Sequence, residues 1–300
     1  MFTPLSIVGV VLNLLVIVAI LRNQDLRKEY LSFSILSLSL TDFLWSLSVT
    51  PLLALLGFLK DFAIPNGCEF YGFLVYALWE TSVLTLVGFA TLRVAGVWFP
   101  EKLKTEEFQL ACKVVPISCW LLAALTLIPI LSQQNGRFGF ECKKFLCIIV
   151  DIDKDQNQLA LHPIKIFMSI IVCAGVLSIA LNIITFIQIS RKTRRLFRQM
   201  KDTNRDLAIK ILQREKRLGS MVMGITGSFF LVYCPITILL IIDPNAAITK
   251  PIIYTITQFL ASSLVVIDPI IYTISQKRYR KEVQSLIIWL YEWAASLQIK

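Results

Sequence analysis

The chain has 300 residues, of which 56% are hydrophobic and only 17% are charged, and its formal net charge is +10. A soluble protein of this length would need far more polar surface, so the composition excludes an ordinary soluble domain. The meaning of the positive charge therefore depends on which segments of this apolar chain carry the lysines and arginines.

Seven apolar stretches are long enough to cross a bilayer, for which about 20 helical residues suffice. Unbroken helices are the expected structure, because every backbone polar group must find its partner inside the hydrocarbon. The predicted fold is an all-α membrane protein, a single seven-transmembrane-helix domain over residues 1–300. The predicted spans are 5–21, 30–58, 70–99, 110–131, 164–189, 218–242 and 252–274.

Positive charge is concentrated in alternate connecting segments. Segments 22–29, 98–109, 190–217 and 275–300 hold 21 lysines and arginines, whereas the segments on the opposite side hold seven. The positive-inside rule therefore predicts a multi-pass plasma-membrane protein with an extracellular N-terminus. The basic stretch in 190–217 has two compatible interpretations, contact with anionic membrane lipids and a docking surface for an acidic cytosolic partner. We expect no nucleic-acid partner.

The first three spans each carry polar residues that are costly in a bilayer. Asn13 follows Gly9 in the first span, and Asp42 lies in the second. Between residues 70 and 99 only Glu80 and Arg93 are charged. Arg93 must be solvated or paired, and we expect it to lie close enough to the cytosolic surface for its side chain to snorkel.

The later spans carry further polar residues and prolines. The fourth holds Trp120, the sixth holds Pro235, and the seventh contains Asp268, Pro269 and Tyr272 in the sequence DPIIY. A proline inside a helix frees a backbone carbonyl and permits a kink. After the last span, residues 275–295 have the character of a short amphipathic helix on the membrane surface.

Three of the seven cysteines fall on the predicted outer side, where disulfides persist. They are Cys68, Cys142 and Cys147. An odd number leaves one pairing open. The four others fall inside or within the bilayer, where they pack as small hydrophobic residues.

Taken in chain order, these residues resemble the rhodopsin-like, class A, G-protein-coupled receptors over essentially the whole chain. The first helix of that family carries Gly-Asn, the second Leu-x-x-x-Asp, the fourth a tryptophan and the seventh Asn-Pro-x-x-Tyr. Its third helix starts at a disulfide cysteine and ends in Asp-Arg-Tyr, which the spacing from Cys68 to Arg93 fits. The matching positions are Gly9, Asn13, Leu38, Asp42, Cys68, Arg93, Trp120, Phe229, Pro235, Asp268, Pro269 and Tyr272.

Two segments, ATLRVAGVWFP and GRFGFECKKFLCIIVD, are similar to the invertebrate orphan group that includes Moody and trapped in endoderm. The resemblance implies an outer disulfide between Cys68 and Cys147 rather than Cys142, because the similar receptors carry their cysteine at the C-I-I position. It also implies that the partners are an extracellular ligand and a heterotrimeric G protein.

The chain departs from the family beside Arg93. Leu92 stands where the family has an acid, so Arg93 lacks its usual neighbouring counter-ion. Glu215, 20 residues before Pro235, occupies the position whose acid pairs with this arginine in some resting receptors. We therefore expect an Arg93–Glu215 pair that opens when the sixth helix swings outward, and either elevated basal activity or altered coupling. Pro235, Pro269 and Tyr272 complete the expected activation switch.

The resemblance also implies a buried polar site. Asp42, Ser82 and Asp268 would face one another at mid-bundle. Two carboxylates in a dry core cannot both be charged and unpaired, so either a sodium ion bridges them or one is protonated. A hydrogen-bonded cluster with water is the alternative, and no other cofactor is expected.

The ligand site is expected in the outer half of the bundle. Val75 stands where amine receptors carry an aspartate, which argues against a monoamine. Glu80 either contacts a ligand or neighbouring polar groups, or forms an internal bond while it is protonated. The apolar and aromatic surroundings favour a small amphipathic or lipid-like ligand, with a peptide still open. The expected ligand-binding residues are Tyr76, Trp79, Glu80, Tyr233, which replaces the family's toggle tryptophan, and Gln258.

Other classes of membrane protein fit the sequence less well. A zinc hydrolase needs several ligands, and His162 is the single histidine. An opsin needs a lysine in the last span, and 252–274 has none. A transporter or channel is the remaining alternative, but the internal repeats typical of transporters are absent from the sequence. We therefore expect neither an enzyme nor a metal site.

Overall fold

A computed structural model describes residues 2–49, 51, 67–131, 137–141, 146–150, 161–199, 205–243 and 249–298. The first two spans are α1 (Phe2–Arg22) and α3 (Ser32–Leu44) with its π-helical extension η1 (Trp45–Val49), joined through α2 (Gln24–Arg27). The third and fourth are α5 (Gly67–Trp98) and α6 (Glu106–Leu131), with the 3-10 turn η2 (Pro100–Lys104) between them. The fifth and sixth are α7 (Leu161–Gln199) and α8 (Arg205–Ile242).

The seventh span consists of two helices, α10 (Pro251–Ser262) and α11 (Leu264–Ser275), and α12 (Lys277–Gln298) follows it. Strands β1 (Arg137–Glu141) and β2 (Leu146–Val150) form an antiparallel hairpin in which Phe140 pairs with Cys147. Within the described residues, seven segments are long and apolar enough to cross a membrane. The predicted all-α, seven-span fold is therefore confirmed.

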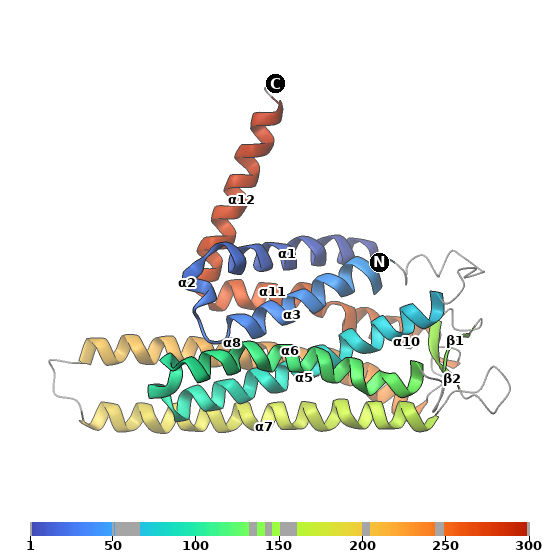
Figure 1. Cartoon of the computed structure of the whole chain (residues 1–300), viewed down its shortest axis with the longest axis horizontal. Helices are drawn as coiled ribbons and strands as arrows, with labels where there is room; N and C mark the ends of the chain where they lie inside the picture. The colour runs from blue at the N-terminus through green and yellow to red at the C-terminus, as the bar shows by residue number, and fades with distance from the viewer. Residues whose placement is uncertain are drawn as a thin grey trace.

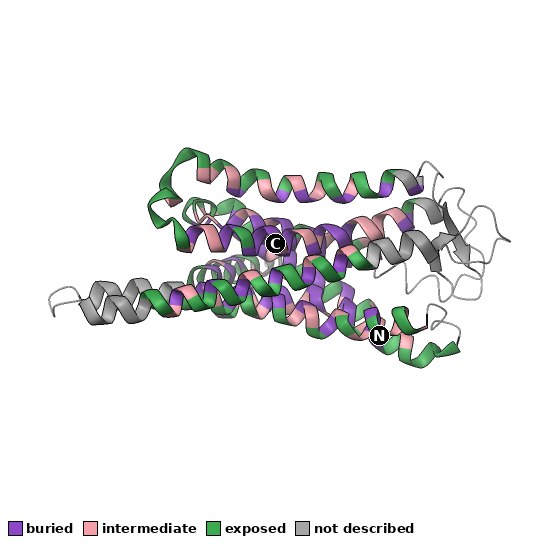
Figure 2. Ribbon diagram, turned by 90° about the horizontal axis from the view of Figure 1, so that it is seen from below, coloured by how far each residue is buried: buried purple, intermediate pink, exposed green. Residues whose placement is uncertain are grey.

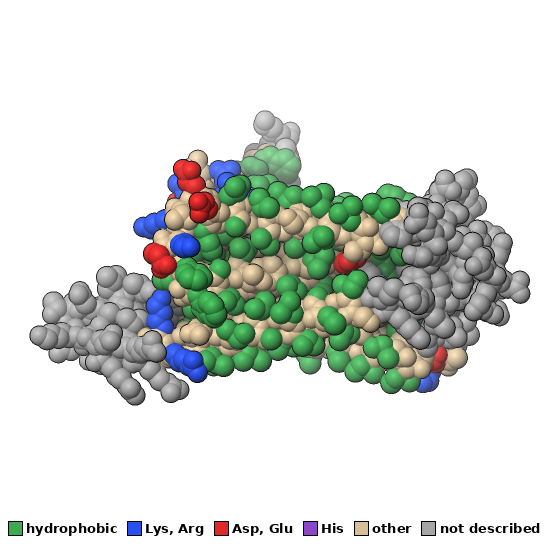
Figure 3. Space-filling model, turned by 60° about the horizontal axis from the view of Figure 1, so that its bottom comes forward, with side chains coloured by type: hydrophobic (Ala, Val, Ile, Leu, Met, Phe, Trp, Pro, Cys, Tyr) green, Lys and Arg blue, Asp and Glu red, His purple; other side chains and the backbone are tan. Residues whose placement is uncertain are grey.

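The helices form one bundle around α5, which packs against α3, α6, α7 and α8. On the opposite side, α1 packs against α3 and α11 (Figure 1). Buried residues line the inward faces, while the outward faces are exposed (Figure 2). Those exposed faces are mostly apolar, and the visible lysines and arginines gather mainly at one end of the bundle (Figure 3). This is the surface expected of a protein whose helices contact lipid.

The helices α7 and α8 extend beyond their predicted apolar spans and project from one end of the bundle (Figure 1). The prediction ended the fifth span at 189 and began the sixth at 218, because residues 190–217 between them are rich in charged side chains. Arginine, lysine, leucine and glutamine are good helix formers, so the helical backbone continues where the apolar sequence stops.

A close approach of α1 to η1 and α11 depends on Gly9. A Cβ atom at this position would overlap Ser46 Oγ and lie 2.8 Å from Val265 Cγ2. We expect Gly9→Ala to lower the free energy of unfolding by about 1–3 kcal/mol through overpacking. The melting temperature of the purified protein measures this loss.

The matched control is Gly227→Ala in α8, where an added Cβ would meet no heavy atom within 4 Å. Alanine is the better helix former, so this variant should be at least as stable as the wild type. Equal losses in both variants would show that the helix, and not the contact with Ser46 and Val265, accounts for the effect.

Candidate functional site

Two polar residues identified from the sequence form interhelical hydrogen bonds. Asn13 Nδ2 donates to the carbonyl oxygens of Gly9 at 2.9 Å and of Val265 at 2.7 Å, which joins α1 to α11. Trp120 Nε1 donates to Ser37 Oγ at 3.0 Å, which joins α6 to α3. These bonds fix the helices around the centre of the bundle.

The three predicted ion-site residues line one small cavity. Asp42, Ser82 and Asp268 come from α3, α5 and α11 and surround about 20 Å³ of space. That volume suits a single water molecule or a small ion. Ser82 Oγ donates to Thr41 Oγ1 at 3.3 Å, and Ser228 Oγ donates to Asp268 Oδ1 at 3.4 Å.

The atoms around this cavity include carboxylate and hydroxyl oxygens, the type of ligand that hard cations take. Asp42 is buried, and its Oδ2 has no hydrogen-bond partner among the described residues. A buried carboxylate oxygen without a donor is costly, and a cation would satisfy it. Sodium at Asp42, Ser82 and Asp268 remains a prediction that this geometry supports.

An aromatic stack adjoins the cavity. The rings of Trp79 and Tyr233 stack with centroids 5.3 Å apart, and Phe229 lies 4.6 Å from Tyr233. Trp79, Tyr233 and Phe229 all line the cavity as well. A ligand that moves Trp79 or Tyr233 would therefore act directly on the polar site.

The other predicted ligand residues do not line the small cavity. Tyr76 is half-buried on α5, and Gln258 is half-buried on α10. Glu80 is buried and accepts a hydrogen bond from Thr126 Oγ1 of α6 at 2.6 Å. Of the two interpretations of Glu80, this geometry favours a bond to a neighbouring polar group, and its contact with a ligand remains a prediction.

Arg93 is buried rather than snorkelling, with no side-chain exposure. Its Nη1 donates to the hydroxyl of Tyr30 at 2.7 Å. The ring of Tyr30 packs against Gly96, where an added Cβ would lie 3.1 Å from it. The prediction failed because it looked for solvent at the helix end, whereas Tyr30 supplies a partner from the segment that precedes α3.

Tyr30 is the functional residue that the sequence reasoning missed. The available signal was a tyrosine at the start of the second span, on the same predicted side as the end of the third. Tyr30 and Arg93 are 63 positions apart, and no sequence pattern indicates that they are in contact.

The Glu215 side chain lies outside the described residues, so its pairing with Arg93 remains a prediction. Gly219, one helical turn further along α8, is described. A Cβ placed on Gly219 would lie 3.9 Å from Arg93 Nη2. Gly219 therefore lies on the face of α8 that is turned toward Arg93.

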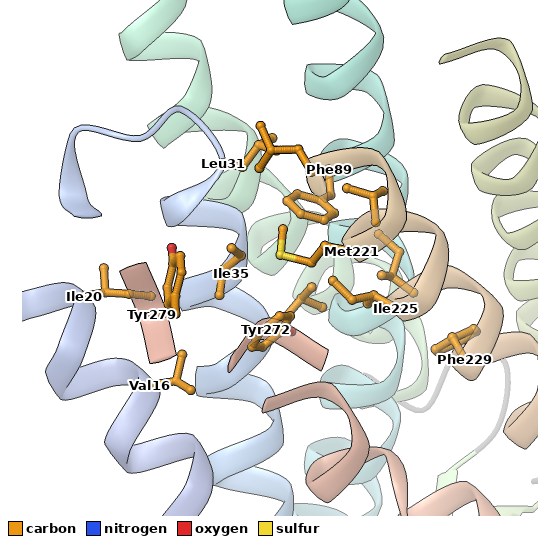
Figure 4. Close-up of a cluster of buried hydrophobic side chains, with 14 of the residues drawn as sticks. Val16, Ile20, Leu31, Ile35, Phe89, Met221, Ile225, Phe229, Tyr272 and Tyr279 are labelled. Carbon is orange, nitrogen blue, oxygen red and sulfur yellow. The ribbon is translucent and has the colours of Figure 1, made fainter. Parts of the chain in front are cut away.

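The remaining switch residues lie in the core. Pro235 is inside α8 and Pro269 is inside α11. Tyr272 is fully buried close to Met221 and Ile225 (Figure 4), and its hydroxyl has no hydrogen-bond partner among the described residues. The predicted disulfide between Cys68 and Cys147 concerns side chains outside the described residues.

A further interhelical hydrogen bond joins the fifth and sixth spans. Asn182 Nδ2 of α7 donates to Thr226 Oγ1 of α8 at 2.9 Å, and both residues are buried. The partner of Asn182 on α8 appears only in the structure.

Comparisons with known proteins agree with this geometry. A family model described as 7 transmembrane receptor (rhodopsin family) matches residues 12–272. Protein trapped in endoderm-1 of Drosophila melanogaster is 21% identical over 303 residues, covering 97% of this chain and 77% of that protein. The crystal structure of squid rhodopsin superimposes with a TM-score of 0.80 at 19% identity, covering 96% of this chain and 84% of that one.

Proposed function

The chain belongs to the rhodopsin family of seven-transmembrane receptors, and from this we propose that it binds an extracellular ligand and activates a heterotrimeric G protein. It is a multi-pass membrane receptor and not an enzyme. We further propose that it lies in the plasma membrane with its N-terminus outside. The distribution of basic residues supports this orientation.

The observation that carries the proposal is the burial of Arg93 between Tyr30 and the Gly219 region of α8. In this arrangement the arginine is withdrawn from any cytosolic partner. An agonist that binds the open state better than the closed state would shift the population toward it. Outward motion of α8 about Pro235 would release Arg93 and open a groove for the helical tail of the G protein.

The ligand would act from the outer half of the bundle through Trp79 and Tyr233. Their stacked rings lie between α5 and α8, the two helices that must separate. The aromatic surroundings support a small amphipathic or lipid-like ligand. Tyr272, whose hydroxyl has no described partner, is free to gain one when the helices rearrange.

Basal G-protein activation tests this function. Wild type, Arg93→Ala and Glu215→Gln would be expressed at matched surface levels and assayed against a panel of G proteins. Glu215→Gln is expected to raise the basal signal and Arg93→Ala to lower it, while Glu292→Gln on exposed α12 leaves it unchanged. A flat response of all variants to every G protein would remove the support for the Arg93–Glu215 pair and favour a non-signalling receptor.

Sodium is the expected ion at Asp42, Ser82 and Asp268. Ligands that bind only the folded state stabilise it by mass action. Raising sodium chloride should therefore raise the melting temperature of the purified receptor more than choline chloride at equal ionic strength. Asp42→Asn should abolish the difference. Equal responses to the two salts in the wild type would exclude a sodium site.

A further inference from the structure

An apolar groove lies on the bundle surface where α1, α11 and α12 meet. It has a volume of about 190 Å³ and is lined mostly by aliphatic side chains, together with the polar side chains of Thr273, Arg280 and Gln284. Its position among transmembrane helices places it against the lipid. The lining includes Leu12 and Val16 of α1, Ile270 and Ile274 of α11, and Arg280 and Ile287 of α12.

The turn between α11 and α12 creates this groove. Gln276 has an extended backbone with φ −115° and ψ 110°, so α12 leaves the bundle at a steep angle to its long axis (Figure 1). Tyr279, Val283 and Leu286 are buried on one face of α12, and Tyr279 is hydrogen-bonded to Ser32 Oγ at 2.9 Å. The adjacent stripe, which contains Arg280 and Ile287, is left facing the groove.

Arg280 gives the groove a positively charged end. Its neighbour Arg278 forms an ion pair with Glu29 at 2.8 Å. The nearest acid on α12, Glu282, accepts a hydrogen bond from Asn23 at 3.0 Å. Arg280 itself is exposed and pairs with no carboxylate in the described part of the chain. An apolar groove thus ends at an available guanidinium group.

We propose that this groove binds one anionic phospholipid of the surrounding leaflet, with its phosphate at Arg280 and an acyl chain along Ile270, Ile274 and Ile287. The aliphatic lining accepts hydrocarbon, and guanidinium groups bind phosphate through two parallel hydrogen bonds. A basic side chain near the membrane surface favours anionic over neutral lipid by about fivefold. The proposal is independent of G-protein signalling.

Native mass spectrometry of the purified receptor tests this site. The probes are phosphatidylglycerol and phosphatidylcholine with identical acyl chains. The wild type is expected to retain phosphatidylglycerol about fivefold better. Arg280→Gln should lower this preference, whereas Lys281→Gln, which removes the same charge from the next residue outside the lining, should keep it. Ile274→Trp, which fills the groove, should reduce retention of both lipids.

The matched variants distinguish lipid binding in this groove from non-specific attraction of anionic lipid to the basic receptor. Ile288→Trp, an exposed change on α12 outside the lining, should retain both lipids as the wild type does. Equal loss in Arg280→Gln and Lys281→Gln would overturn the proposal. So would equal retention of phosphatidylcholine or cholesterol by the wild type, or unchanged retention in both Arg280→Gln and Ile274→Trp. Melting temperatures confirm that each variant is folded.

Discussion

Replacing Tyr30 with phenylalanine is expected to raise basal G-protein activation by about tenfold or more. The substitution removes the 2.7 Å hydrogen bond from Arg93 and keeps the aromatic ring that packs on Gly96. Hydrogen bonds to charged groups contribute about 1.5–3 kcal/mol, and every 1.4 kcal/mol is a factor of ten in a population. Because the bond forms only while Arg93 is buried, its loss destabilises the closed state.

The measurement is nucleotide exchange on the responsive G protein at matched surface expression, without added ligand. Tyr291→Phe on α12 is the control, because this substitution removes the same hydroxyl group from an exposed tyrosine. Adding Arg93→Ala to Tyr30→Phe should return the signal to the low level of Arg93→Ala alone. An unchanged basal signal in Tyr30→Phe would mean that this hydrogen bond persists in the active state or contributes nothing to the equilibrium.

This prediction depends on how the missing acid at Leu92 is compensated. Leu92 is buried, and an acid there would have lain beside Arg93 in sequence. The structure places a neutral hydroxyl group on the guanidinium instead. A neutral acceptor attracts a cation less strongly than a carboxylate, so this one hydrogen bond restrains Arg93 less than an adjacent acid would. The expectation to measure in the wild type is either elevated basal activity or altered coupling.

The seven spans could be predicted because each helix is apolar over enough residues to cross a bilayer. The polar cluster of Asp42, Ser82 and Asp268 could be predicted through the family resemblance, since those positions lie at fixed depths on three helices. The structure gathers them around one cavity.

The partners of Arg93 and Asn182 could not be predicted in the same way. Tyr30 and Thr226 reach them from other elements, and the contacts depend on the rotation and tilt of neighbouring helices. Apolar periodicity fixes which face of a helix is buried, but it does not fix which hydroxyl meets which polar group. The same reason explains why the sequence left Glu80 with two interpretations, and the bond to Thr126 makes one of them testable.

Replacing Thr126 with valine is expected to destabilise the receptor by about 1–3 kcal/mol, because the buried carboxyl group of Glu80 would lose its donor. The two residues are linked by a 2.6 Å hydrogen bond, and valine has nearly the shape of threonine. Replacing both polar partners by apolar groups should cost much less than replacing one. Thermal unfolding of Thr126→Val, Glu80→Leu and the double variant measures the coupling between them.

The double variant distinguishes an internal bond from a ligand contact. If Glu80 serves only Thr126, Glu80→Leu combined with Thr126→Val should recover most of the stability that Thr126→Val loses. Thr91→Val is the matched control, since the exposed Thr91 hydroxyl donates only to the Val87 carbonyl one turn earlier on its own helix. Additive losses in the double variant would show that Glu80 has another partner, and the outer half of the bundle, with Trp79 and Tyr76, would then be the place to seek it.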